Sequence, residues 1–236
     1  MWACFNRNLK IKPDIWGVWM ELLRRNAGSV LWLRRFHKRV QENLIKHAEA
    51  AGVAAERVVF AGRMPDRAQH LARHRHADLF LDTPRFGGHS TLADVVWAAV
   101  PSIVLPSENM ASRIGASILS AIGGALFVAR DLEDYADMAH AWANPKQPTN
   151  RKRLHHFRQH INTTLRHPDS PFAAPAYTKR LEGIYALAWE TFRARRQPKD
   201  APIVLGGSAL EALGRKAPPL VYTGDSVVPG GGRGVA

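Results

Sequence analysis

Short apolar runs alternate with amphipathic stretches from the N-terminus to about residue 130. Five of these runs have the length and the β-branched or aromatic content of buried strands, namely Trp2–Phe5, Val30–Leu33, Val58–Phe60, Leu79–Leu81 and Ile103–Leu105. The stretches between them carry apolar residues three and four positions apart, as helices that cover a sheet do. The alternation predicts an α/β fold in which helices flank a parallel sheet.

Proline and glycine mark the ends of the predicted helices. Pro13 opens the first helix, and Gly28 and Gly52 are expected to stop the first and second helices at their C-termini. Further helices are expected at three places: from near Ser90, over about 109–122 and over about 131–143.

The pattern divides the chain into three regions. Residues 1–145 form the sheet-containing domain, and residues 146–200 hold helices, over about 150–165 and 177–196, that are expected to pack on the same domain. Residues 201–236 are rich in glycine and proline, with eight glycines in the last 34 residues. Such a composition cannot bury enough surface to order itself, so we predict a disordered tail with a possible short helix at 209–213.

Composition restricts the class of protein. The 236 residues are 46% hydrophobic, which is enough for a core. They contain no apolar run of about 18 residues and no signal-peptide pattern after Met1. The single cysteine, Cys4, excludes an internal disulfide and a Cys-rich zinc site, and it fits a reducing compartment. We therefore expect a cytoplasmic protein, and since Trp2 already looks like a strand, we expect a missing segment upstream.

The net charge of +13 raises the question of a nucleic-acid partner. Residues 151–200 hold eleven Lys and Arg against four Asp and Glu. The aromatic residues in this segment fall at helical spacings that suit packing, namely Phe157, Tyr185, Trp189 and Phe192. This favours a solvated basic helix face, with a nucleic-acid-binding module as the alternative.

The densest candidate for chemistry is the segment from Asp82 to Asp94, which runs from a buried strand through Gly87 and Gly88 into a helix. Ligands of open α/β sheets bind beyond the carboxyl ends of strands, and a helix N-terminus offers free N–H groups to a phosphate. The glycines would let a ligand approach the backbone. The segment therefore predicts a phosphate site.

Three polar side chains at this helix start have two possible uses. Ser90 and Thr91 could donate hydroxyls to a phosphate, and Asp94 could accept hydrogen bonds from ribose hydroxyls. Thr91 and Asp94 also have the spacing of a helix capping box, which would leave no role in ligand binding. The residues alone leave both open.

Two further groups are candidates. His70 and Arg73 lie on one helical face and suit a nucleobase pocket, although a lone surface histidine usually has no such role. His70 and His74 at i, i+4, with His76 nearby, are a rival metal-binding set. Lys10 follows the first strand, at the edge where it could neutralise a diphosphate, or it could be an ordinary surface lysine.

Taken together, these residues resemble the protein O-linked N-acetylglucosamine (O-GlcNAc) transferase family, with its bacterial and plant SPINDLY-type members. The matching pieces occur in the family's order over about residues 4–195: Phe5-Asn6-x-x-x-Lys10-Ile11, Ser29–Leu33, Arg57–Phe60, His70–Arg73, Ala77–Thr83, Gly88–Thr91 with Asp94 and Trp97-Ala98, and Ala111–Arg113 with Ala116-Ser117.

The resemblance implies the C-terminal, Rossmann-like half of a GT-B glycosyltransferase that transfers N-acetylglucosamine from UDP-GlcNAc to Ser or Thr hydroxyls of proteins, with inversion and without a metal or other cofactor. It implies that Lys10 is catalytic and contacts the diphosphate. The donor-binding residues that it implies are His70 and Arg73 for the uracil, Ser90 and Thr91 for the diphosphate, Asp94 for the ribose, and Arg67 and His89 as supporting members.

The chain departs from the family in three ways. Arg7 stands where the family usually places an amide, and Ser90 replaces the usual threonine. The first catalytic half and the tetratricopeptide repeats are absent from these residues. The alternatives are therefore a donor-binding fragment without independent activity, or a related transferase that uses UDP-glucose or GDP-fucose.

Overall fold

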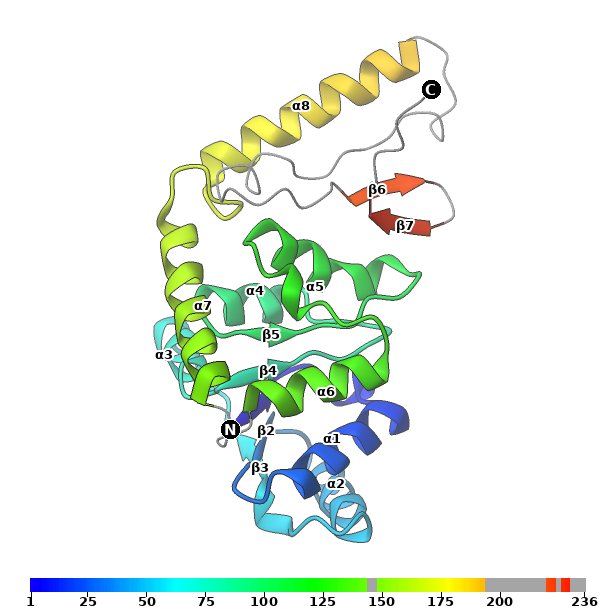
Figure 1. Cartoon of the computed structure of the whole chain (residues 1–236), viewed down its shortest axis with the longest axis vertical. Coiled ribbons are helices and arrows are strands. Elements are labelled where there is room, and N and C mark those ends of the chain that lie inside the picture. Colours follow the sequence, from blue (N-terminus) through cyan, green and yellow to red (C-terminus); the bar gives the residue numbers. More distant parts are fainter. Residues whose placement is uncertain (144–147, 194–219, 224–225, 230–236) are drawn as a thin grey trace. The chain divides into compact units, whose positions relative to one another are not determined.

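The computed structural model describes residues 1–143, 148–193, 220–223 and 226–229 (Figure 1). The chain forms two compact units, one made of residues 1–120 and 124–162 and the other containing residues 121–123 and those from 163 onward. None of the helices described is long and apolar enough to cross a membrane.

The first unit is built on a parallel five-stranded sheet with the order β3-β2-β1-β4-β5 (Figure 1). Its strands are β1 (Trp2–Cys4), β2 (Leu31–Arg34), β3 (Val58–Ala61), β4 (Leu79–Leu81) and β5 (Ser102–Ile103). Beyond β5, a parallel bridge joins Val104 to Val128. The predicted α/β class and all five predicted strands are confirmed.

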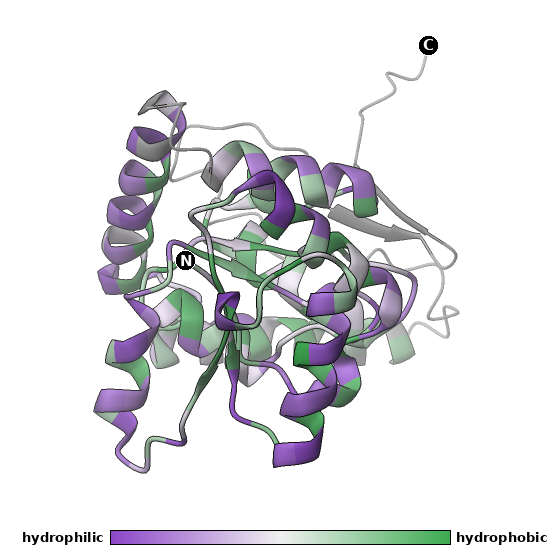
Figure 2. Ribbon diagram, turned by 90° about the horizontal axis from the view of Figure 1, so that it is seen from below, coloured by the Kyte–Doolittle hydropathy of each residue, from purple (hydrophilic) through white to green (hydrophobic). Residues whose placement is uncertain are grey.

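Strand register aligns apolar side chains across the sheet. Trp2 pairs with both Leu31 and Leu79, and Leu31 pairs with Val58. All four side chains are buried, as is the rest of β4. In Figure 2 the strands are mainly green, whereas the surrounding helices carry purple on one side. Since burying a large apolar side chain contributes roughly 1.5–3 kcal/mol, these short strands supply much of the core.

Helices cover both faces of this sheet. They are α1 (Pro13–Arg25), α2 (Lys38–Ala50), α3 (Arg67–His74), α4 (Ser90–Trp97), α5 (Met110–Ala121), α6 (Leu132–Ala143) and α7 (Pro148–Arg166), with short 3-10 turns η1 (Asn8–Lys10), η2 (Ala55–Arg57) and η3 (Ala125–Phe127). Helix α1 packs against α6, and α3 packs against α4. Figure 1 shows α6 in front of β4 and β5 and α4 behind them.

Helix ends follow the predicted signals in part. Pro13 is the first residue of α1, as predicted. Gly52 has φ +76° and donates its N–H to the carbonyl of Glu49, so it ends α2 as predicted. The role predicted for Gly28 is wrong: α1 ends at Arg25, and Asn26 caps it with both its N–H and its side-chain amide on the carbonyl of Leu22.

The portion of α7 in the first unit packs against that unit. Leu154, Phe157 and Ile161 are buried, and the Phe157 ring lies 4.6 Å from the ring of Phe127, between centroids. Arg158 donates to the backbone carbonyl of Asp78 at 3.0 Å.

The second unit contains the rest of the described chain. Helix α8 (Ala174–Arg193) exposes Tyr185, Trp189 and Phe192, and the rings of Trp189 and Phe192 stack with 5.7 Å between centroids. The packing of α8 on the first unit stays a prediction. Strands β6 (Leu220–Thr223) and β7 (Ser226–Pro229) pair antiparallel. The rest of the predicted disordered tail, including the short helix at 209–213, lies outside the described residues.

The strand order places a topological switch point at the centre of the sheet edge. From β1 the chain continues to β2 on one side, and from β4 it continues to β5 on the other. The loops that leave the carboxyl ends of β1 and β4 therefore diverge, which is where open α/β sheets bind ligands. Lys10 follows β1, and the segment from Asp82 to Asp94 follows β4.

Candidate functional site

The loop from Asp82 to His89, here called the β4–α4 loop, is organised around the buried carboxylate of Asp82. Oδ1 of Asp82 accepts a hydrogen bond from the N–H of Gly88 at 2.7 Å and another from the side-chain amide of Asn6 at 2.7 Å. The hydroxyl of Tyr135 donates to the carbonyl of Asp82 at 2.9 Å. Burial raises the pKa of Asp82 to about 6, although the hydrogen bonds from Gly88, Asn6 and Thr83 to the carboxylate act to lower it.

The two glycines of the loop make room for this network. A Cβ at Gly87 would lie 2.7 Å from Oδ2 of Asp82, and a Cβ at Gly88 would lie 2.9 Å from Oδ1 of Asn6. Neither position can hold a side chain unless the network moves. The glycines are thus required by the packing of Asp82 and Asn6, a reason that the sequence alone did not reveal.

The N-terminus of α4 has no side-chain cap among the described residues. The helix begins at Ser90 with His89 as the N-cap residue, and Thr91 lies inside the helix. The carboxylate of Asp94 pairs with groups on α3. The capping-box alternative is therefore wrong. The first N–H groups of α4, together with the positive end of its dipole, remain available to an anion at this position.

Lys10 reaches the β4–α4 loop from η1. Its Nζ donates to the carbonyl of Gly87 at 2.7 Å and lies 4.0 Å from the centroid of the Phe86 ring. The Phe86 ring also stacks on His89, with 5.2 Å between centroids, and Nε2 of His89 lies 3.1 Å from the carbonyl oxygen of Ala111. Burial lowers the pKa of Lys10, and the neighbouring carboxylate of Asp82 opposes this effect. One fixed positive charge thus lies beside the start of α4.

Three predicted site residues meet where α3 packs on α4. Nη2 of Arg67 donates to Oδ1 of Asp94 at 3.0 Å, and Nε2 of His70 lies 3.5 Å from Oδ2 of the same carboxylate. Burial, followed by the charge of Arg73, lowers the pKa of His70, while Asp94 opposes this. His70 is therefore a neutral imidazole at neutral pH, able to donate and accept hydrogen bonds.

Arg73 points elsewhere in the structure. Its Nη1 donates to the carbonyl of Gly62 at 2.8 Å, and its guanidinium lies over the ring of Phe5 at 4.7 Å from the centroid. It holds the loop after β3 against the end of β1. Its contact with a base stays a prediction.

The rival metal set does not assemble into a described site. The rings of His70 and His74 meet edge to face with 5.0 Å between centroids, and His74 is buried, which lowers its pKa to about 3. Within the ranges that the structure describes, no group of three His, Cys, Asp or Glu side chains lies together in a way that could hold a metal ion.

Sequence reasoning assigned no role to four residues that shape the site, namely Asn6, Asp82, Phe86 and Tyr135. One signal was present: Asp82 follows a buried strand directly, and a buried carboxylate needs partners. Asn6, the side-chain partner of this carboxylate, lies 76 positions away, and Tyr135, which bonds the Asp82 carbonyl, lies 53 positions away, so the identity of both depends on the fold.

Comparison with known proteins gives this geometry a context. The model of glycosyl transferase family 41 matches residues 1–181. An Arabidopsis thaliana protein named "Probable UDP-N-acetylglucosamine--peptide N-acetylglucosaminyltransferase SEC" is 33% identical over 207 residues, covering 86% of this chain and 20% of that protein. A Caenorhabditis elegans UDP-N-acetylglucosamine--peptide N-acetylglucosaminyltransferase is 34% identical over 135 residues, covering 57% of this chain and 12% of that protein.

A solved structure gives the same indication. A mutant of the Thermobaculum terrenum O-GlcNAc transferase superposes with a TM-score of 0.68 at 28% identity, covering 80% of this chain and 35% of that one. The chain thus spans about a fifth of the Arabidopsis relative and about a third of the bacterial enzyme.

Proposed function

We propose, from the premise that this chain belongs to glycosyl transferase family 41, that it is the donor-binding half of a protein O-GlcNAc transferase. Its fold is the Rossmann-like C-terminal half of a GT-B glycosyltransferase. The reaction that we propose is transfer of N-acetylglucosamine from UDP-GlcNAc to a Ser or Thr hydroxyl of a protein.

The observation that carries the proposal is the uncapped start of α4 beside Lys10. A diphosphate placed there would accept hydrogen bonds from the first N–H groups of α4 and from the hydroxyls of Ser90 and Thr91. Lys10, held by Gly87 and Phe86, would add a positive charge on the other side. These groups favour the negative charge that develops on the leaving diphosphate.

The nucleoside would lie toward α3. Asp94 would accept hydrogen bonds from the ribose hydroxyls, exchanging its contacts with Arg67 and His70. Neutral His70 would then hydrogen-bond or stack on the uracil, with Arg67 and Arg73 nearby on the same helix. His89, stacked on Phe86, would support the loop.

In the proposed reaction the acceptor oxygen attacks the anomeric carbon of the sugar on the face opposite UDP. The bond between this carbon and the diphosphate oxygen breaks, both its electrons leave with UDP, and the configuration inverts. The hydroxyl proton passes to a base that we place outside this chain. Lys10 and the α4 dipole take the role that a metal ion has in other transferases, so we propose no metal or other cofactor.

The remaining parts of the proposal concern the whole protein. Because the chain spans only a fifth of the Arabidopsis relative, we propose that an N-terminal catalytic half with tetratricopeptide repeats contributes to acceptor binding, and that this chain alone binds donor without transferring it. We also propose a cytoplasmic location, which the single buried cysteine, Cys4, suits.

Calorimetric titration with UDP tests the donor site. We expect the wild-type chain to bind UDP, and we expect Lys10→Ala and Asp94→Ala each to weaken binding by about tenfold or more, since each removes a charge-assisted contact. Lys12→Ala and Asp137→Ala remove matched exposed charges and should change the affinity little. Unchanged affinity in both site variants would overturn the assignment. Competition with GDP, UDP-glucose and GDP-fucose identifies the donor.

A further inference from the structure

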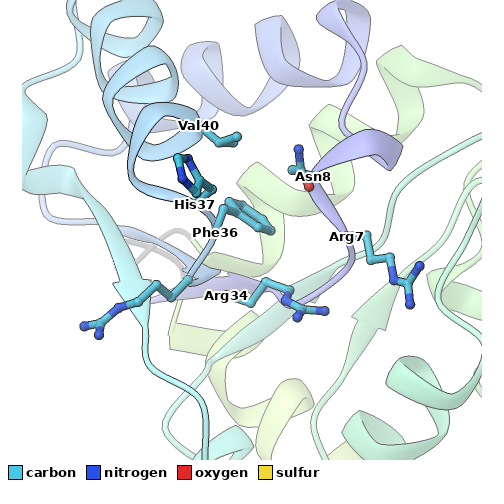
Figure 3. Close-up of a pocket in the computed structure, with 7 residues that line it drawn as sticks. Arg7, Asn8, Arg34, Phe36, His37 and Val40 are labelled. Carbon is cyan, nitrogen blue, oxygen red and sulfur yellow. The ribbon is translucent and has the colours of Figure 1, made fainter.

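A cavity of about 520 Å³ lies at the carboxyl ends of β1 and β2, on the side of β1 away from β4 (Figure 3). Its walls come from Arg7 and Asn8 after β1, from Arg34 and Arg35 at the end of β2, and from the residues that begin α2. None of these residues has a role in the donor site described above. We call it the arginine cavity.

The three arginines of this cavity have no protein partners. The side chains of Arg7, Arg34 and Arg35 are exposed, and within the part of the chain that the structure describes they donate no hydrogen bond and form no ion pair. Other arginines, such as Arg57 and Arg130, do have such partners. Figure 3 shows Arg7 and Arg34 extending from neighbouring strand ends into the same region. Arg7 and Arg34 thus bring guanidinium groups with free donors to one hollow, and Arg35 lines its edge beside Gly62 of the loop after β3.

The start of α2 adds to the positive potential. This helix begins at Lys38 with His37 as its N-cap, and its first turn contains no acidic residue. Lys38 and Arg39 instead place positive charge at the positive end of the dipole, which is unfavourable. The ion pair formed there joins Lys38 to Glu42 at 3.7 Å and does not reach the arginines. An anion in the cavity would relieve this repulsion and find guanidinium forks suited to carboxylates.

We propose that the arginine cavity binds an acidic side chain of the protein acceptor, a proposal that rests on the proposed transferase function. Phe36 and Val40 give the cavity an apolar wall. Its lining is confined to residues after β1, at the end of β2 and at the start of α2, whereas a nucleic-acid backbone would need a longer positive track. The cavity opens at the same sheet edge as the donor site. A protein segment that presents its hydroxyl at Lys10 can therefore extend across the end of β2.

The spacing of the strands predicts where the acidic residue lies. Lys10 contacts the β4–α4 loop, so the distance to the arginine cavity is counted from β4. β2 is two strands away from β4, which is about 10 Å at the usual distance between strands. An extended chain covers this distance in about three residues. We therefore expect preferred acceptors to carry Asp or Glu about three positions from the modified Ser or Thr.

Fluorescence anisotropy with labelled acceptor peptides tests the inference. A short peptide with a central Ser and Glu at those positions is compared with its Gln counterpart, on the full chain saturated with UDP at physiological salt. We expect the Glu peptide to bind more tightly, and Arg34→Gln/Arg35→Gln to weaken it by about tenfold or more while leaving the Gln peptide unchanged. Lys46→Gln/Arg75→Gln removes the same charge from exposed positions outside the cavity and should change Glu-peptide affinity by less than about twofold.

The outcomes separate this inference from the donor function. If UDP binds but both peptides bind equally, or if the cavity variant keeps its preference for Glu, the inference is overturned and the donor site stands. If UDP does not bind while the Glu preference depends on the arginines, the donor assignment fails and the cavity remains an acidic-peptide site. A single-stranded RNA that displaces the peptide at lower concentration, with the same arginine dependence, would overturn the acceptor assignment in favour of nucleic acid.

Discussion

The carboxylate of Asp82 is fully buried, so its titration should change the free energy of unfolding of the chain with pH. Burial raises its pKa from 3.8 to about 6. The folded protein therefore binds this proton more tightly than the unfolded chain does, so Asp82 favours folding below pH 3.8. This contribution is lost as the pH rises through about 6.

The magnitude follows from the two pKa values. At 1.36 kcal/mol for each tenfold change in proton affinity, a rise from 3.8 to about 6 corresponds to about 3 kcal/mol. An asparagine at this position has nearly the same shape and does not titrate. The stability of Asp82→Asn relative to the wild type should therefore increase by up to about 3 kcal/mol between roughly pH 4 and pH 7.

Urea unfolding of both proteins across this pH range measures the difference, in which the titration of all other groups cancels. Asp137→Asn removes an exposed carboxylate from α6 and should not reproduce the pH dependence. The reasoning is refuted if the difference is flat, or if it changes in the opposite direction. The latter result would mean that the hydrogen bonds from Gly88, Asn6 and Thr83 outweigh burial and hold the carboxylate ionised.

Two further substitutions test the packing of the β4–α4 loop. Gly88→Ala places a Cβ 2.9 Å from Oδ1 of Asn6 and 3.2 Å from the backbone nitrogen of Leu92, so it should destabilise the fold by about 1–3 kcal/mol and weaken UDP binding. Gly28→Ala has nothing within 4 Å and should do neither; equal effects of the two would contradict the argument. Tyr135→Phe leaves the buried carbonyl of Asp82 without its hydroxyl donor and should cost about 1–3 kcal/mol, measured by thermal unfolding; an unchanged melting temperature would show that the bond contributes nothing.

The strands could be predicted from the sequence because each one is short and contains buried apolar residues, so it stands out as a short apolar run. The helix start marked by Pro13 was equally clear. The prediction that Gly28 ends α1 was wrong because Asn26, two residues earlier, already bonds a carbonyl of the last turn of α1 with its side-chain amide. Local spacing suggested a capping box for Thr91 and Asp94, but α3 packs beside α4 and provides Arg67 as a stronger partner for that carboxylate.

The parts of the site that were not predicted depend on which strands become neighbours. Asn6 and Asp82 are 76 positions apart and meet only because β1 pairs with β4. The arginine cavity likewise requires β1 to lie next to β2. The sequence pattern shows that strands exist, but it does not contain their order, and the order decides which side chains gather at one edge.

The β4–α4 loop is short, yet its shape is held from outside: Asn6 and Lys10 reach it from the end of β1, Ala111 from α5 and Tyr135 from α6. The isolated loop peptide would not keep this conformation, so grafting it onto another protein would transfer its sequence without its geometry. During synthesis on the ribosome, a chain that ends before Tyr135 has made every residue assigned to donor binding and still lacks the group that fixes the loop to the sheet. Nucleotide binding should thus arise late in the folding of the nascent chain, once α6 has emerged and docked.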